Sequence, residues 1–256
     1  MKDRYWTLTM SPNIMKVDAV IRQEKGDGLM HQWFKRLLLV FVAFSLIACN
    51  TSEEQPSTTE STNVPVENVQ DGPVLVVYFS WADNAVLEDD VDAVSSPSVI
   101  APGNVEQLAT WVQEESGGDL FSIRVTDPYP SDWNDCLARA NQERREQARP
   151  ELVENVSDIS QYDTIFLGYP NWWYGVPMPV LHFLEQNEND LAGKQVYLFY
   201  SHGTGGLANS VSLIEEAIPQ ASISDNIFDC YEEEASSSQE AIQNWVSELG
   251  YSQELE

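Results

Sequence analysis

Three aromatic residues in succession form the part of this chain best suited to holding a flat ligand. They stand in the loop Pro170-Asn171-Trp172-Trp173-Tyr174, directly after the short apolar run Ile165 to Leu167. An uncharged run of this length is typical of a strand buried on both faces of a parallel sheet, and ligands of such sheets bind beyond the carboxyl ends of the strands. The rings therefore either cover the edge of the core or stack on a planar molecule such as a flavin.

Small polar residues suited to holding an anion stand in two other places. Ser80 closes a second uncharged run, and Gly103 and Asn104 come directly before residues with helical apolar spacing. The first N–H groups of a helix have no partner within it, so they offer a site for phosphate. Ser80, Gly103, Asn104 and the N–H of Val105 are the candidates for such a site.

A third loop, 201–206, reads SHGTGG and carries the one histidine found among these segments. Ser201, Gly203 and Gly206 can present backbone groups to the polar edge of a planar ligand. Because imidazole titrates near neutral pH, His202 is a candidate proton donor to a reduced flavin or a quinone-like substrate. The alternative is a hydrogen bond that holds the loop itself.

The elements that would position these loops alternate along the chain. Apolar runs predict five strands and helical spacing predicts five helices, which indicates a parallel sheet covered on both faces. The three loops would then meet at one site. The expected strands are 73–80, 118–125, 163–169, 195–200 and 222–228, and the expected helices are one from 104, then 132–147, 176–186, 207–217 and a closing helix with Ala241, Ile242, Trp245, Val246 and Leu249 on one face.

The first quarter of the chain has the features of an exported protein. Residues 30–48 hold a basic start and a largely apolar stretch of twelve residues, too short for a spanning helix but typical of a signal peptide. Residues 46–49, LIAC, resemble the lipobox of bacterial lipoproteins, which implies cleavage before Cys49 and a lipid on its sulfur. Residues 1–29 are interpreted as a mis-called start, and 49–71 as a disordered polar tether. The folded domain is expected over 72–252, with an acidic insertion at 85–102.

Charge and cysteine usage exclude several classes of protein. From Cys49 onward, six Lys or Arg face 37 Asp or Glu, which makes nucleic-acid binding very improbable. Cys136 and Cys230 have no Cys-x-x-Cys spacing, although two cysteines of an exported protein could pair. The three histidines form no metal-ligand cluster, so no metal is expected.

Three motifs, taken in order, carry a resemblance to a known family. They are YFS at the first strand, LGYPxWW after the third and SHGTGG after the fourth, and they lie within residues 73–249. In this order and spacing the chain resembles a bacterial flavodoxin. The resemblance implies the flavodoxin-like fold, a three-layer α/β/α sandwich around a five-stranded parallel sheet of order 2-1-3-4-5. It also implies non-covalent FMN and electron transfer through the flavin.

The phosphate loop departs from the pattern of that family. The family's loop commonly runs hydroxyl-x-hydroxyl-Gly-Asn-Thr without a break, whereas the insertion of about eighteen residues, 85–102, here separates Ser80 from Gly103, and Val105 stands where the threonine would be. One hydroxyl contact is missing, which would weaken FMN binding by roughly tenfold or more. In an alternative alignment, Asp83 and Asn84 form the loop, but no helix follows them directly.

The sequence thus predicts an FMN-binding, flavodoxin-like electron-transfer protein, lipid-anchored on the extracytoplasmic face of the cell membrane. Its expected partner is a redox protein or a small-molecule electron acceptor. One alternative is an FMN-dependent quinone or small-molecule reductase. Another is a ligand-binding lipoprotein on the same fold that has lost the flavin.

Overall fold

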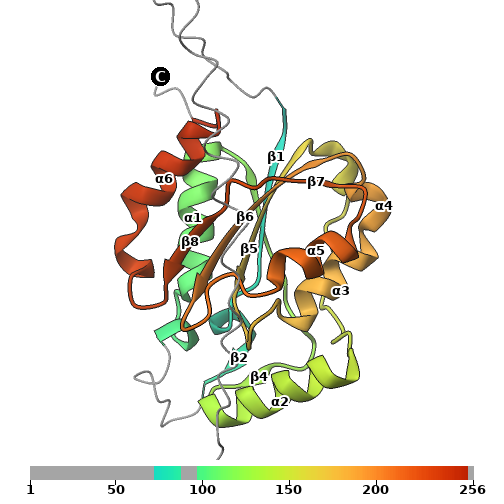
Figure 1. Cartoon of the computed structure of the whole chain (residues 1–256), viewed down its shortest axis with the longest axis vertical. Helices are drawn as coiled ribbons and strands as arrows, with labels where there is room; N and C mark the ends of the chain where they lie inside the picture. Colours follow the sequence, from blue (N-terminus) through green and yellow to red (C-terminus); the bar gives the residue numbers. More distant parts are fainter. Residues whose placement is uncertain (1–71, 88–96, 253–256) are drawn as a thin grey trace, which may run out of the picture. The chain divides into compact units, whose positions relative to one another are not determined.

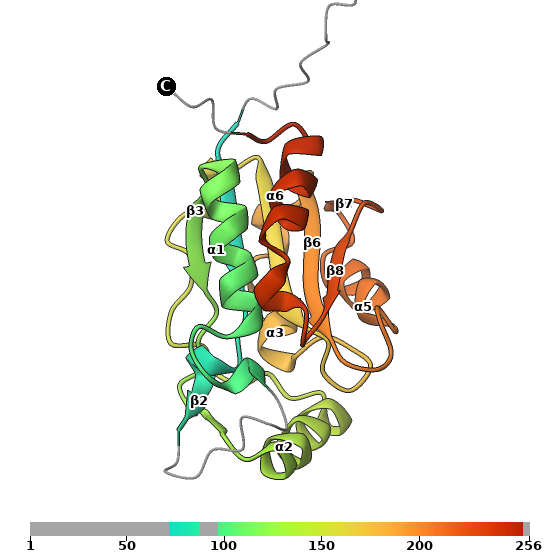
Figure 2. The same cartoon turned by 90° about the vertical axis from the view of Figure 1, so that its left-hand side faces the viewer.

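A parallel sheet forms the middle layer of the domain (Figures 1 and 2). The computed structural model describes residues 72–87 and 97–252. The expected extension, signal peptide, Cys49 and tether, together with 88–96 of the insertion, lie outside the described residues. The strands follow the order β3-β1-β5-β6-β7, β8 also pairs with β6, and every pairing in this sheet is parallel. Their bounds are β1 Val74–Tyr78, β3 Asp119–Ser122, β5 Thr164–Pro170, β6 Gln195–His202, β7 Ser222–Ile223 and β8 Phe228–Tyr231.

The predicted order 2-1-3-4-5 is confirmed, with one difference in the last strand. The sequence predicts a single strand over 222–228, but the structure divides it into β7 and β8. Between them the Asn226 N–H donates to the Ser224 hydroxyl (3.1 Å). Side chains of this kind bond to nearby backbone and favour turns over continuous strands.

Helices cover both faces of the sheet, as predicted (Figure 2). Alternate residues of β1 serve the two layers: Leu75 and Val77 belong to one apolar cluster, and Val74 and Val76 to the other. On α6, Ile242, Trp245 and Val246 are buried, whereas Ala241 is exposed, so its expected place in the core is wrong. One layer holds α1 (Asn104–Ser116) and α6 (Gln239–Glu248), and the other holds α3 (Met178–Gln186), the short α4 (Glu188–Leu191) and α5 (Ser210–Ala217).

A further helix, α2 (Trp133–Glu146), lies beyond the carboxyl ends of the strands (Figures 1 and 2). It begins where expected, because the Asp132 carboxylate accepts a hydrogen bond from the Asp135 N–H (2.9 Å). Beside it, β2 (Ala85–Val86) pairs with β4 (Tyr129–Pro130) in a small sheet that the sequence did not indicate. This group of elements caps the end of the sheet where the candidate loops emerge.

The two central strands extend further than the sequence predicts. The strand expected over 163–169 continues to Pro170 as β5, and the strand expected over 195–200 continues to His202 as β6. A side chain at Gly168 would place its Cβ 2.3 Å from the Phe199 ring, so glycine allows that ring to cross the strand. Several candidate residues therefore stand on strand ends. Within the described ranges, no helix has the length and apolarity needed to cross a bilayer.

Candidate functional site

A cleft of about 190 Å³ opens at the carboxyl end of the sheet, where the loops after β5 and β6 meet. Most of the residues that the sequence assigned to a planar ligand line it: Pro170, Asn171, Trp172, Trp173, Tyr174, Ser201, His202 and Gly203. Gly206 is outside the lining, although its carbonyl oxygen accepts a hydrogen bond from the Asn171 amide. The structure therefore brings the two loops together as one wall.

The aromatic loop turns sharply at two residues with left-handed backbone. The N–H of Trp172 donates to the carbonyl of Gly175 (3.0 Å), and the N–H of Gly175 donates back to Trp172 (3.1 Å). Between them Trp173 has φ 47° and Tyr174 has φ 67°. A turn with positive φ at both central positions strongly prefers Asn-Gly, and each bulky residue there costs about 1–2 kcal/mol. Such strain is typical of ligand sites.

The three rings of this loop have different surroundings. Trp172 is buried and meets Phe79 and Tyr129 edge-on, with centroids 5.3 and 5.1 Å apart, so this ring does cover the core. Trp173 is partly buried and faces Trp133. Tyr174 is 60% exposed and lies over the backbone of Gly205, where a Cβ would come within 2.9 Å of the ring. Trp173 and Tyr174 remain as the rings available for stacking.

The end of β1 holds a hydroxyl group that has nothing to bond to. Ser80 is 1% exposed, and its Oγ is fully buried without a hydrogen-bond partner. It points at Gly103, since a Cβ on that glycine would lie 2.2 Å from the Ser80 Oγ. An unsatisfied buried hydroxyl costs about 1–3 kcal/mol, and here it faces the N-terminus of α1, where anions bind well.

Asn104 and Val105 are placed differently from each other. The Asn104 amide donates to the carbonyl of Glu232 (2.9 Å) and so joins α1 to the end of β8. The Val105 side chain is 2% exposed and packs in the core, which leaves only its backbone N–H for a ligand. Asn84, from the alternative alignment, holds backbone groups of Ser80, Ile123 and Val125.

Acidic groups stand close to this hydroxyl and glycine. The Gly103 N–H donates to the Glu106 carboxylate (3.0 Å), and Asp83 accepts from the Ser122 hydroxyl (2.6 Å). Burial, followed by the charge of Asp83, raises the pKa of Glu106. A phosphate would therefore be held by neutral donors against nearby negative charge.

His202 is held by protein groups on both sides of its ring. It is 6% exposed, with Nδ1 2.7 Å from the carbonyl of Gly203 and Nε2 3.0 Å from the Asp229 carboxylate. Both partners are acceptors, so both bonds form together only when both nitrogens carry hydrogen. This arrangement provides the loop hydrogen bond that was the alternative to a proton-donor role.

Asn171 supplies a second polar atom without a partner. Its side-chain Oδ1 is buried and makes no hydrogen bond, whereas its backbone N–H donates to the Ser201 carbonyl (2.8 Å). Among the side chains of the described residues, this Oδ1 and the Ser80 Oγ are the two such atoms. Both lie at the carboxyl end of the sheet.

Five further residues line the cleft that the sequence analysis did not single out as ligand contacts, although Thr204 belongs to the predicted 201–206 loop. Trp133 comes from α2 and Ser98 from a 3-10 turn at the end of the insertion, both far from the motifs in sequence. Only the aromatic character of Trp133 could have indicated it. The five residues are Trp81, Ser98, Trp133, Thr204 and Glu232.

The described cysteines and acidic groups provide no other reactive centre. Cys136 and Cys230 are free, buried and in different apolar clusters, so they do not pair. Burial raises the pKa of Cys136 to about 12 and that of Cys230 to about 11, which keeps both thiols protonated at neutral pH. Over the ranges that the structure covers, no group of His, Cys, Asp or Glu is arranged to hold a metal ion.

Taken together, these features fit a flavin phosphate. An unpartnered hydroxyl, a glycine whose missing side chain leaves the approach open, and the start of a 13-residue helix supply the donors. The ring end offers exposed aromatic faces and the unpartnered Asn171 Oδ1. The cleft itself is smaller than the ~300–1,000 Å³ usual for ligand pockets, so a three-ring system would be only partly enclosed by it.

Comparisons with known proteins point to one family. The family model described as flavodoxin matches residues 94–249. A candidate flavoprotein from Bacteroides eggerthii has 24% identity and a TM-score of 0.51, with 69% of this chain and 97% of that one covered. Another, from Bacteroides uniformis, has 22% identity and a TM-score of 0.51, with 70% and 99% covered. These structures share the fold. None of the curated proteins compared with the chain matches it.

Proposed function

The chain belongs to the flavodoxin family, and from this premise we propose that it binds FMN non-covalently and transfers electrons. The observation that carries the proposal is the Ser80 hydroxyl, which is buried, unpartnered and directed at the glycine before α1. A group that costs stability in the folded protein is explained if a ligand bonds to it. Phosphate is the ligand that suits a helix N-terminus.

Each part of the carboxyl end of the sheet has a distinct task in this proposal. Ser80, Gly103 and the first N–H groups of α1 hold the phosphate, while Trp173 and Tyr174 cover the ring system. The 201–206 loop and Asn171 present polar groups to the edge of the rings. His202, fixed by Asp229, orients the loop backbone through Gly203. When bound, FMN supplies the one- or two-electron redox chemistry.

The test is the visible absorption of the purified full-length protein, before and after addition of FMN. Flavin bands that persist through gel filtration are the expected result. A folded, colourless protein that takes up no FMN would overturn the proposal and favour a flavin-free binding protein. If the flavin is bound and the protein also turns over a nicotinamide donor with a quinone, the function is that of a reductase.

We also propose that the domain is held outside the cytoplasm by a lipid on Cys49 and exchanges electrons there with a redox protein or a small acceptor. The support is the sequence LIAC at 46–49 after a basic and apolar segment. In cells fed a labelled fatty acid, the wild-type protein should carry label and sediment with membranes. Cys49→Ala should lose the label, and its retention would contradict the proposed anchor.

A further inference from the structure

Helix α2 holds the aromatic turn from outside the sheet. Besides Trp133, it contributes Arg144, which stands in its last turn and whose guanidinium donates a hydrogen bond to the backbone carbonyl of Trp173. Arg144 and Trp173 are 29 positions apart in the chain. They meet because α2 lies beyond the carboxyl ends of the strands, where the aromatic loop emerges (Figures 1 and 2).

The carbonyl that α2 reaches belongs to one of the two residues with left-handed backbone. The bonds between Trp172 and Gly175 close the turn and leave the carbonyls of Trp173 and Tyr174 between them. The Tyr174 carbonyl accepts from the N–H of Asn209, the residue before α5 (3.5 Å). Both central carbonyls are therefore bonded from outside the turn. Such support is needed, since a strained backbone persists only when its surroundings hold it.

The Trp173 ring is held as well as its backbone. It lies against Trp133 and Trp172, with ring centroids 5.6 and 5.4 Å away. Trp81 contacts the same two indoles at 6.4 and 6.2 Å, so four tryptophans form a closed circle of contacts. The indole N–H of Trp81 donates to the Pro130 carbonyl (3.1 Å) and fixes that side of the circle. All four rings line the cleft, and the contacts that place Trp173 there need no ligand.

We propose that Arg144 is a positioning residue for the flavin rings, because its bond to the Trp173 carbonyl keeps the aromatic turn in the conformation that stacks on them. The inference rests on the proposed flavin binding and adds a residue that lies outside the cleft lining. Without this bond the turn relaxes from positive φ, and the fraction of protein ready to bind falls. The apparent Kd is the intrinsic value divided by that fraction, so binding weakens although no contact to the ligand is lost.

The experiment compares FMN with riboflavin, which lacks the phosphate, by quenching of flavin fluorescence on the full-length protein. Arg144→Ala should weaken both flavins by the same factor, roughly threefold to tenfold, as expected for one lost hydrogen bond from an exposed charged group. The two losses should be equal because the turn serves the rings and not the phosphate. Arg144→Lys, which keeps a charged donor, should bind both flavins more tightly than Arg144→Ala.

Arg145→Ala is the matched control. Arg145 is the next residue of α2, stands in the same last turn and is exposed like Arg144. Both changes remove one positive charge from the end of the helix, but only Arg144 bonds to the Trp173 carbonyl. Arg145→Ala should change neither flavin affinity. The near-ultraviolet circular dichroism of the flavin-free protein, to which packed indoles contribute, should change in Arg144→Ala alone. An unchanged spectrum in Arg144→Ala would overturn the inference, because Trp173 would then have kept its place.

A second background tests whether Arg144 acts through Trp173. Trp173→Gly removes both the ring and the cost of its positive φ. In that background, Arg144→Ala should alter the affinity for either flavin by less than about twofold, since the two residues belong to one interaction. An undiminished loss there would assign Arg144 a general structural role and overturn the inference.

The outcomes separate the inference from the function on which it rests. If the wild type binds FMN and Arg144→Ala binds it equally well, the role of Arg144 is overturned and flavin binding stands. A loss confined to FMN would mean that Arg144 acts on the phosphate by its charge, which also overturns the inference. If the wild type takes up neither flavin, both proposals fail together.

Discussion

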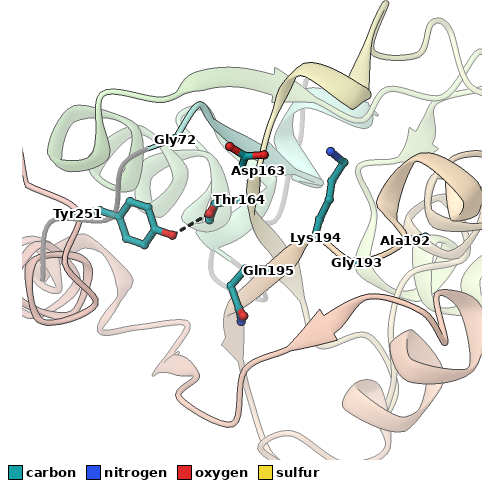
Figure 3. Close-up of a pocket in the computed structure, with 8 residues that line it drawn as sticks. All are labelled: Gly72, Asp163, Thr164, Ala192, Gly193, Lys194, Gln195 and Tyr251. Carbon is teal, nitrogen blue, oxygen red and sulfur yellow. Dashed lines mark hydrogen bonds between the residues drawn. The ribbon is translucent and has the colours of Figure 1, made fainter.

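A hollow lies at each end of the parallel sheet, and the two ends differ in whether their polar side chains have hydrogen-bond partners. At the amino end a hollow of about 350 Å³ lies between the starts of β5 and β6 (Figure 3). There the Thr164 hydroxyl lies 2.7 Å from that of Tyr251, and the Lys194 ammonium donates to the carbonyls of Ser160 and Tyr162. The cleft at the carboxyl end is smaller, about 190 Å³. Yet both buried side-chain atoms that lack a partner among the described residues lie at this end, the Asn171 Oδ1 in the cleft lining and the Ser80 Oγ just after β1.

The difference teaches that the volume of a hollow is a poor guide to function in this fold. The hollow at the amino end is larger, and its Thr164 hydroxyl and Lys194 ammonium are hydrogen-bonded to other protein groups. The carboxyl end bears costs that packing alone does not require: an orphaned hydroxyl, an orphaned amide oxygen and two bulky residues with positive φ. Such costs persist where a ligand compensates them.

The largest contrast between the ends is expected from adding one methyl group to a glycine. Gly103→Ala places a Cβ 2.2 Å from the Ser80 Oγ. It should cost about 1–3 kcal/mol in the free energy of unfolding and weaken FMN roughly a hundredfold, since two bonds to a charged group are disturbed. Denaturant unfolding and fluorescence titration measure the two effects.

Gly193→Ala is the control at the amino end. Gly193 has φ 77° with no atom within 4 Å of an added Cβ, so the change costs only backbone strain, about 1 kcal/mol. The FMN affinity should stay unchanged. Equal loss of FMN in both variants would mean that flavin binding follows general stability rather than the carboxyl-end site.

A smaller contrast comes from removing one hydroxyl at each end. Tyr251→Phe leaves the buried Thr164 hydroxyl without this partner and should lower the free energy of unfolding by about 1–2 kcal/mol, with FMN binding intact. Ser80→Ala should do the reverse. The flavin-free protein keeps its stability or gains up to about 1 kcal/mol, while FMN binds roughly tenfold more weakly. Loss of stability in flavin-free Ser80→Ala would show that its hydroxyl has a protein partner.

The sequence was sufficient for the sheet and for most of the ring end of the site. Continuous apolar runs such as Ile165 to Leu167 identify buried strands, and strands that alternate with helical spacing determine a parallel sheet with its loops at one end. The loops at 170–174 and 201–206 therefore could be assigned to one cleft before any coordinates. The long central strands leave few alternatives for where those loops emerge.

The other parts of the site and the break in the last strand could not be predicted, because they depend on contacts that leave no local pattern in the sequence. Ser98 reaches the cleft only because Val99 packs in the core, and Trp133 only because α2 sits beyond the strand ends. Trp172 has the same residue type as Trp173 yet is buried in the core, since adjacent positions in a tight turn point different ways. At the break between β7 and β8 the Asn226 N–H donates to the Ser224 hydroxyl, a bond of the kind that competes with a sheet ladder.

Relief of backbone strain in the aromatic loop should raise stability and weaken FMN binding, and both effects should be smaller than those above. Tyr174→Gly removes the cost of φ 67° on a ring that is 60% exposed, so the flavin-free protein should gain up to about 1 kcal/mol. FMN should weaken by roughly threefold to tenfold through the lost aromatic contact. Gln147→Gly relieves a similar φ, 51°, at the end of α2 and should gain stability without changing FMN binding. Weaker FMN binding in both variants would mean that the Tyr174 ring has no specific role in binding FMN.

The smallest effect is a pH dependence that differs between a carboxylate at the site and one away from it. Burial and the charge of Asp83 raise the pKa of Glu106 above its ordinary 4.5, so the stabilisation from its protonation is complete below 4.5 and is lost as pH rises through the raised value. The Arg149 guanidinium lowers the pKa of Glu185, whose contribution is present above 4.5 and lost as pH falls through the lowered value.

Glu106→Gln keeps an acceptor for the Gly103 N–H and removes the charge. At neutral pH it should therefore raise the free energy of unfolding, by roughly a few tenths of a kcal/mol because solvent screens this partly exposed group. Glu185→Gln should lower stability at neutral pH by a similar amount and converge with the wild type in acid. Thermal melts from pH 3 to 8 measure both effects. For each variant, the difference in stability from the wild type is plotted against pH, and slopes of the same sign for the two variants would contradict the contrast. Glu106→Gln should also tighten FMN more than riboflavin, since only the phosphate senses the removed charge.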